Sequence, residues 1–254
     1  MLEVKIGRTT INFGLVIVDM QNGFVSSEGS YDKMGLNVKN YQRIIPKIQE
    51  LINFCRKENI PVFYTEAVRE PSGIDLLVNI HNILPRSREE RLLKIPICVR
   101  GTWDAQTIDK LKPTVEDHII IKRRDSAFQD TELRIWLQSM RINTLIFCGI
   151  DTSICVETSL RDAFNLGYDI VLVADATASG TIKHYDTTLE RVGDYYGIVV
   201  HFSNLKKMIN TLSRINNGNL ENDLKTDERI SEFLEKHDLI DLRKAKRTKK
   251  SKSL

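Results

Sequence analysis

The sequence predicts an α/β protein of three layers, α/β/α, in which a six-stranded, mostly parallel, Rossmann-like sheet lies between two layers of helices. Six apolar segments of strand length recur along the chain, and segments with helical spacing of apolar residues separate them. The first strand segment, residues 14–20, is apolar at consecutive positions and rich in β-branched residues, which is typical of a parallel strand buried on both faces. Strands that alternate with helices form right-handed βαβ units, whose helices cover both faces of the sheet.

The remaining elements are predicted from the same two patterns. Strands are predicted at residues 61–65, 118–122, 144–150, 169–175 and 197–202. Helices are predicted at residues 41–60, 130–140, 155–166 and 183–196. In the first of these helices Ile48, Leu51 and Cys55 recur three or four positions apart with polar residues between them, so that one face is apolar.

One domain is predicted over residues 1–212, because a chain of 254 residues with 41% hydrophobic residues can bury a single large core. Within it, residues 66–103 are irregular and contain three prolines. A long excursion of this kind, carrying one or two short helices, is typical of a lid or a binding loop. Residues 213–254 are predicted to be an extension with a short helix and a disordered basic end.

The positive charge of the chain is concentrated at its end. Residues 240–254 contain seven Lys or Arg and one Asp, so the rest of the chain has a formal charge of −3 rather than +3. The basic end lacks interleaved aromatic residues, and we expect no nucleic acid as a partner. A nucleic-acid-associated protein that acts through this basic segment is kept as an alternative.

Membrane and secretion signals are not predicted. No apolar run approaches 18 residues, and the first residues lack the basic and then apolar pattern of a secretory signal. The four cysteines are scattered without C-x-x-C spacing, which favours free thiols in a reducing, cytoplasmic location.

Three polar residues stand at or shortly after the ends of predicted strands. Asp19 ends the first strand, Lys122 ends the strand at 118–122, and Cys155 follows the strand at 144–150. Because sites in parallel sheets lie beyond the carboxyl ends of the strands, these three side chains are expected to converge. Each also has a structural interpretation, since Asp19 suits a turn, Lys122 a solvated strand end, and Cys155 a small core position.

The three residue types suit nucleophilic catalysis. A thiol must become a thiolate before it attacks a carbonyl, and a helix N-terminus and the Lys122 ammonium are both expected to lower the pKa of Cys155. Asp19 is expected to accept the thiol proton and to donate it later to a leaving amine. The sequence therefore predicts a Cys155 nucleophile, an Asp19 base and a Lys122 that holds charge and orientation.

Three separated motifs carry a family resemblance. The segments LVIVDMQNGFV, IIIKRRDSAF and FCGIDTSICVETSLRDAFNLGYDIVLVADAT contain these residues in the order of the isochorismatase-like cysteine hydrolases. The resemblance extends over about residues 13–208, and it implies that Asp19, Lys122 and Cys155 are the family's catalytic triad. It also implies the isochorismatase-like fold and a homo-oligomer, either a dimer or a tetramer.

The same resemblance implies an unusual loop after the strand at 144–150. A cis peptide bond is implied between Ile150 and Asp151, a rare arrangement outside proline. The backbone N–H groups of Asp151 and Cys155 are implied to form the oxyanion hole.

Two further segments narrow the branch of the family. SSEGSYDKMGLNV, residues 26–38, and RGTWDAQTIDKLKP, residues 100–113, resemble the ureidoacrylate amidohydrolases and related carbamoyl-cleaving members. Nicotinamidases carry an Asp-x-His metal site after the second strand, whereas this chain reads FYTEAVRE there, without histidine. No metal and no cofactor are therefore expected.

The resemblance and the triad predict a cysteine-dependent amidohydrolase that cleaves a C–N bond of a small amide, carbamoyl or ureido compound through a thioester. A vinyl ether hydrolase of the isochorismatase type is an alternative, although that chemistry needs an acid more than a nucleophile. The second alternative is a catalytically silent relative that acts as a binding protein. Candidates for substrate binding are Phe24, Trp103 and Phe128 as pocket walls, and Arg69 for a substrate carboxylate.

Overall fold

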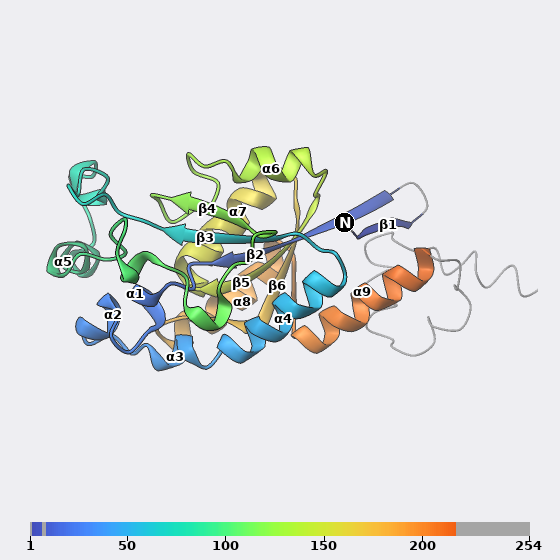
Figure 1. Ribbon diagram of the computed structural model, residues 1–254, viewed down its shortest axis with the longest axis horizontal. Coiled ribbons are helices and arrows are strands. Elements are labelled where there is room, and N and C mark those ends of the chain that lie inside the picture. The colour runs from blue at the N-terminus through green and yellow to red at the C-terminus, as the bar shows by residue number, and fades with distance from the viewer. Residues whose placement is uncertain (1, 7–8, 217–254) are drawn as a thin grey trace, which may run out of the picture.

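The computed structural model describes residues 2–6 and 9–216 and has three layers, with helices on both faces of one sheet (Figure 1). Most of the predicted extension, from residue 217 onward, lies outside the described residues, as do its predicted short helix and basic end. No helix in the described part of the chain is long and apolar enough to cross a membrane.

The sheet contains the six predicted parallel strands in the order β4-β3-β2-β5-β6-β7. Their bounds are Thr9–Val18 for β2, Val62–Ala67 for β3, His118–Lys122 for β4, Thr144–Ile150 for β5, Asp169–Ala178 for β6 and Ile198–Val200 for β7. A further strand, β1 (Glu3–Ile6), pairs antiparallel with the first half of β2 and is not predicted from the sequence. The predicted three-layer, six-stranded parallel fold is confirmed.

Helices occupy most of the segments between the strands. The bounds are Asn22–Val25 for α1, Ser30–Lys33 for α2, Lys39–Gln42 for α3, Ile45–Lys57 for α4, Arg86–Lys94 for α5, Leu133–Ser139 for α6, Glu157–Asn165 for α7, Ile182–Tyr195 for α8 and Phe202–Asn216 for α9. Shorter turns are η1 (Leu77–Asn79), η2 (Trp103–Ala105), η3 (Asp109–Leu111) and the π-helical η4 (Thr152–Val156).

Two helices differ from the sequence prediction. The helix predicted at 41–60 is interrupted between α3 and α4, because Pro46 has no N–H with which to continue the helical hydrogen bonds. The helix α9 is not predicted, although Phe202, Leu205 and Ile209 are buried along it at helical spacing.

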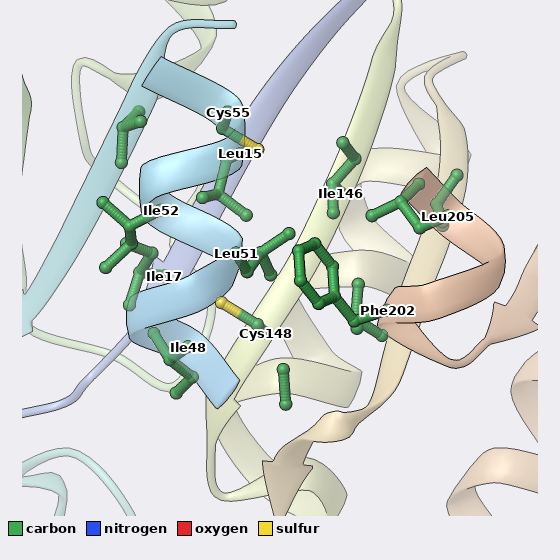
Figure 2. Close-up of a cluster of buried hydrophobic side chains, with 14 of the residues drawn as sticks. Leu15, Ile17, Ile48, Leu51, Ile52, Cys55, Ile146, Cys148, Phe202 and Leu205 are labelled. Carbon is green, nitrogen blue, oxygen red and sulfur yellow. The ribbon is translucent and has the colours of Figure 1, made fainter. Parts of the chain in front are cut away.

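The core has two halves, one on each face of the sheet. Leu15 and Ile17 of β2 point toward α4 and α9, whereas Val16 and Val18 point toward α6, α7 and α8. Figure 2 shows the first half, in which Leu51 of α4 lies among side chains of the sheet and of α9. Because both faces are covered, β2 is buried from Ile11 to its end, which explains its consecutive apolar residues.

The predicted excursion at 66–103 leaves the sheet at the end of β3 and contains η1 and α5. In Figure 1, α5 lies beyond the ends toward which β3 and β4 point. None of the residues of α5, all of which are described, is fully buried. The excursion therefore lies at the carboxyl ends of the strands, where the three predicted site residues are expected.

Candidate active site

The three predicted residues meet at the carboxyl ends of the strands. Asp19 directly follows β2, Lys122 is the last residue of β4, and Cys155 lies in η4 after β5. The Nζ atom of Lys122 is 2.7 Å from Oδ2 of Asp19, and both residues are about 1% exposed. Cys155 lines the same cavity as this ion pair. The convergence expected from the sequence is thus present in the fold.

Lys122 is held as a charged ammonium. Besides Asp19, its Nζ donates to the carbonyl oxygens of Arg124 and Asp125, each at 3.1 Å. Three acceptors match the three N–H donors of an ammonium. Burial alone would lower the pKa of Lys122, but the Asp19 carboxylate outweighs it and the pKa is raised.

Asp19 is oriented by its backbone and by a neighbouring strand. Its φ of 52° lies in the left-handed region, which Asp adopts more readily than most residues. Thr65 of β3 donates its hydroxyl to Oδ1 of Asp19 at 2.6 Å. This bond leaves Oδ2 to face Lys122, so Thr65 positions the carboxylate. The sequence does not single out Thr65, because its proximity depends on the register between β2 and β3.

The pKa of the Cys155 thiol is raised, whereas a helix N-terminus and Lys122 were expected to lower it. Burial raises its pKa above the ordinary thiol value, Lys122 opposes this, and Asp19 and Asp125 reinforce it. The thiol therefore needs a base in order to react.

The loop before Cys155 is organised by Asp151. The peptide bond between Ile150 and Asp151 is cis, as the family resemblance implies. The Asp151 carboxylate accepts hydrogen bonds from the hydroxyls of Tyr41 at 2.8 Å and Ser179 at 2.9 Å, and from the N–H groups of Ser153 and Gly180, each at 2.9 Å. These neutral donors fix the turn that presents Cys155.

Gly149 explains how β5 can lead into this loop. Its φ is 103°, and a Cβ at this position would lie 2.2 Å from the carbonyl oxygen of Val18. Only glycine combines this backbone conformation with so close an approach of β5 to β2. The distance from Cys155 to Asp19 depends on that approach, because Val18 precedes Asp19.

The cavity at this site has a volume of about 150 Å³. Strand ends, the segment with α1–α3, and the excursion all contribute to its lining. The lining residues are Asp19, Phe24, Tyr31, Tyr41, Ala67, Arg69, Arg88, Arg91, Leu92, Ile97, Lys122, Asp125, Ile150, Asp151, Ile154 and Cys155. A cavity of this size, lined by both apolar and charged side chains, suits a small polar molecule.

The structure divides the four predicted substrate-binding residues into two pairs. Phe24 and Arg69 line the cavity. Trp103 and Phe128 do not, and that prediction is corrected. Trp103 is 46% exposed in η2, and Phe128 packs against Tyr168, with ring centroids 6.0 Å apart. Aromatic size alone therefore does not distinguish a pocket wall from packing.

Several lining residues are not predicted, among them Tyr31, Arg88 and Arg91. Arg88 of α5 donates to both carboxylate oxygens of Asp125, at 2.7 and 2.6 Å, and so connects the excursion to the loop that holds Lys122. Nothing in the spacing of these charged residues signals the contact, which depends on how the excursion folds back. No group of three or more His, Cys, Asp or Glu within residues 2–6 and 9–216 is placed to hold a metal ion.

Comparison with known proteins identifies the family. The Isochorismatase domain model matches residues 13–202. A ureidoacrylate amidohydrolase RutB of Pseudomonas savastanoi is 35% identical over 182 residues, which are 69% of this chain and 73% of the relative. Another, from Acinetobacter baylyi, is 30% identical over 78% of this chain and 82% of the relative.

Solved structures agree with the fold. An isochorismatase family protein from Desulfovibrio vulgaris has a TM-score of 0.67 at 25% identity, covering 79% of this chain and 99% of that one. A cysteine hydrolase from Pseudomonas syringae also has a TM-score of 0.67 at 22% identity, and the match covers 84% of this chain and 99% of that one.

The chain belongs to the isochorismatase family of hydrolases. Within that family it is an amidohydrolase, an enzyme that acts on C–N bonds.

Proposed function

We propose that this amidohydrolase uses Cys155 as its nucleophile and cleaves a small amide, carbamoyl or ureido compound through a thioester. The observation that carries the proposal is the buried Lys122–Asp19 ion pair, which lies in one cavity with the thiol. The relatives named ureidoacrylate amidohydrolases support the ureido class of substrate.

In the first half of the reaction, the Cys155 sulfur attacks the substrate carbonyl while Asp19 accepts the thiol proton. The raised pKa of Cys155 makes this base necessary. The backbone N–H groups of Asp151 and Cys155 form the oxyanion hole, and Lys122 remains charged beside Asp19. Collapse of the tetrahedral intermediate breaks the C–N bond, and the nitrogen takes the proton from Asp19 and leaves as ammonia or an amine.

In the second half, water attacks the thioester carbonyl, and Asp19 accepts a proton from that water. The C–S bond breaks, and the proton returns to the sulfur. The products are an acid, or carbamate where a carbamoyl group is transferred, and the free thiol. A vinyl ether hydrolysis would give the Cys155 sulfur no bond to form, and the proposal therefore favours amide and ureido substrates.

Ammonia release from a panel of small amides and ureido compounds tests the proposal. We expect Cys155→Ala and Cys155→Ser to lower kcat by about a thousandfold or more, because within the described residues no other thiol lines the cavity. Intact-mass measurement of the quenched wild type is expected to show an acyl adduct on Cys155. Turnover by Cys155→Ala equal to that of the wild type would exclude the covalent route.

A silent binding protein would hydrolyse no member of the panel. The homo-oligomer and the cytoplasmic location stay predictions.

A further inference from the structure

The cavity contains more positive than negative charge after its internal ion pairs are counted. Its charged lining residues are Asp19, Arg69, Arg88, Arg91, Lys122, Asp125 and Asp151. Lys122 is neutralised by Asp19, and Arg88 by Asp125. Asp151 contributes one negative charge, held by neutral donors. Arg69 and Arg91 contribute two positive charges without an acidic partner among the described residues.

Each of these two arginines donates one hydrogen bond, but from a different nitrogen of the guanidinium group. The Nε of Arg91 donates to the carbonyl of Ser87 at 3.0 Å, one turn earlier on α5. Both of its terminal nitrogens lack a hydrogen-bond acceptor within the described residues. Arg69 instead directs a terminal nitrogen to the carbonyl of Arg123 at 2.5 Å. Both terminal NH₂ groups of the Arg91 guanidinium are therefore without a partner among the described residues.

Tyr31 relates Arg91 to the reactive sulfur. Both Arg91 and Cys155 line the cavity together with Tyr31. Burial raises the pKa of Tyr31 and Arg91 opposes this, so the phenol lies within electrostatic reach of the guanidinium group. A molecule that spans one aromatic side chain could thus contact the sulfur at one end and the guanidinium at the other.

We propose that Arg91 is a specificity-determining residue of this cavity, which binds the carboxylate of an anionic amide or ureido substrate. This inference rests on the proposed function. A planar guanidinium binds a carboxylate through two parallel hydrogen bonds, which a neutral amide cannot replace. Arg69, on the neighbouring wall, adds positive charge, and one of its two terminal nitrogens is already engaged by the carbonyl of Arg123.

The test uses two probes that differ by one charge, 3-ureidopropionate and its N-methylamide. Binding is measured by calorimetry on the Cys155→Ala protein, so that turnover does not interfere. We expect the acid to bind at least about tenfold more tightly than the N-methylamide, and Arg91→Gln to remove that preference. Arg91→Lys is expected to retain part of it, because the charge remains while the fork is lost.

Arg86→Gln is the matched control. Arg86 is on the same helix, its side chain is 91% exposed, and it pairs with Glu90 away from the cavity. The inference is overturned if the two probes bind equally, if neither binds, or if Arg86→Gln removes the preference for the acid as Arg91→Gln does. Ammonia release by the wild type is recorded separately. If the acid binds in an Arg91-dependent way but no compound is hydrolysed, the proposed function is contradicted, whereas the proposed carboxylate site at Arg91 is still supported.

Discussion

At the scale of single residues, the environment of Cys155 decides its reactivity. A sequence with a cysteine near a helix start and a lysine at a strand end suggests an activated thiolate. Burial and the Asp19 carboxylate instead raise the pKa of Cys155. Proton transfer to Asp19 therefore has to accompany attack. A thiol that stays protonated until substrate is present is also less open to oxidation and alkylation.

We therefore predict opposite effects of Asp19→Asn on two reactions of Cys155. Removing the carboxylate lowers the pKa of the thiol, because Lys122 remains as an uncompensated positive charge. Alkylation of Cys155 by iodoacetamide at pH 7 should therefore become several times faster, whereas ammonia release should fall by about a hundredfold or more. Mass spectrometry of the Cys155 peptide measures the first rate.

Asp186→Asn serves as the control for a change of charge, since Asp186 is exposed on α8. Slower alkylation in Asp19→Asn than in the wild type would show that the carboxylate promotes the thiolate of the free enzyme, and the protonated resting thiol would then be wrong.

At the scale of elements, α7 follows Cys155 directly and is anchored to α8 through Glu157. This residue is 6% exposed, and its carboxylate accepts hydrogen bonds from Arg161 at 2.6 Å, Arg191 at 2.7 and 2.8 Å, and Thr188 at 2.8 Å. Burial would raise its pKa, but these partners outweigh it and the pKa is lowered. The same helix contacts η4 through Ser159, which donates to the carbonyl of Cys155 at 2.6 Å.

Glu157→Gln is expected to lower the free energy of unfolding by about 1 to 2 kcal/mol at pH 7, a modest value because both arginines are more than a third exposed. A lowered pKa in the folded state stabilises the protein above the unfolded pKa of about 4.3, and this contribution disappears as the pH falls through the folded value. Urea unfolding at several pH values measures the difference.

The difference in the free energy of unfolding between Glu157→Gln and the wild type should therefore become smaller below about pH 4. Glu190→Gln, at an exposed position of α8, is the control and should hardly change the free energy of unfolding. A difference that grows at acidic pH would mean that folding raises the pKa of Glu157 instead of lowering it.

At the scale of the whole molecule, the fold separates stability from chemistry. Most of the two halves of the core lies along the strands, and the cavity lies at their carboxyl ends, where the core residues Tyr41 and Ile150 also line it. Leu51 of α4 is fully buried among sheet and α9 residues and does not line the cavity (Figure 2).

Leu51→Ala is accordingly expected to lower the free energy of unfolding by about 3 kcal/mol, through lost burial and a residual void, with kcat changed less than about twofold. Leu93→Ala is the comparison: because Leu93 is 62% exposed on α5, this substitution should hardly lower the free energy of unfolding. Urea unfolding and ammonia release at 25 °C measure both effects. A large loss of kcat in folded Leu51→Ala would refute this separation.

Much of the fold follows from local sequence patterns. The bounds predicted for β4 and β5 agree with the structure, because short, largely apolar runs between polar turns are typical of strands, although Ile119 and Ile121 of the edge strand β4 are exposed. The excursion at 66–103 is recognisable from its prolines and its lack of periodicity. The strand β1 is not predicted because a four-residue edge segment has too short a pattern, and α9 is missed because its apolar spacing begins only after the last strand.

The sequence by itself determined the order of strands and helices and the three residues of the candidate triad, since periodicity and the ends of strands are local properties of the chain. Tertiary structure alone decided which side chains line the cavity and in which direction the pKa of Cys155 is shifted. Arg91, Tyr31 and Thr65 reach the site from segments far apart in the chain, and the pKa of the thiol depends on burial by such segments. Contacts of this kind arise only when distant segments pack together, and no local spacing encodes them.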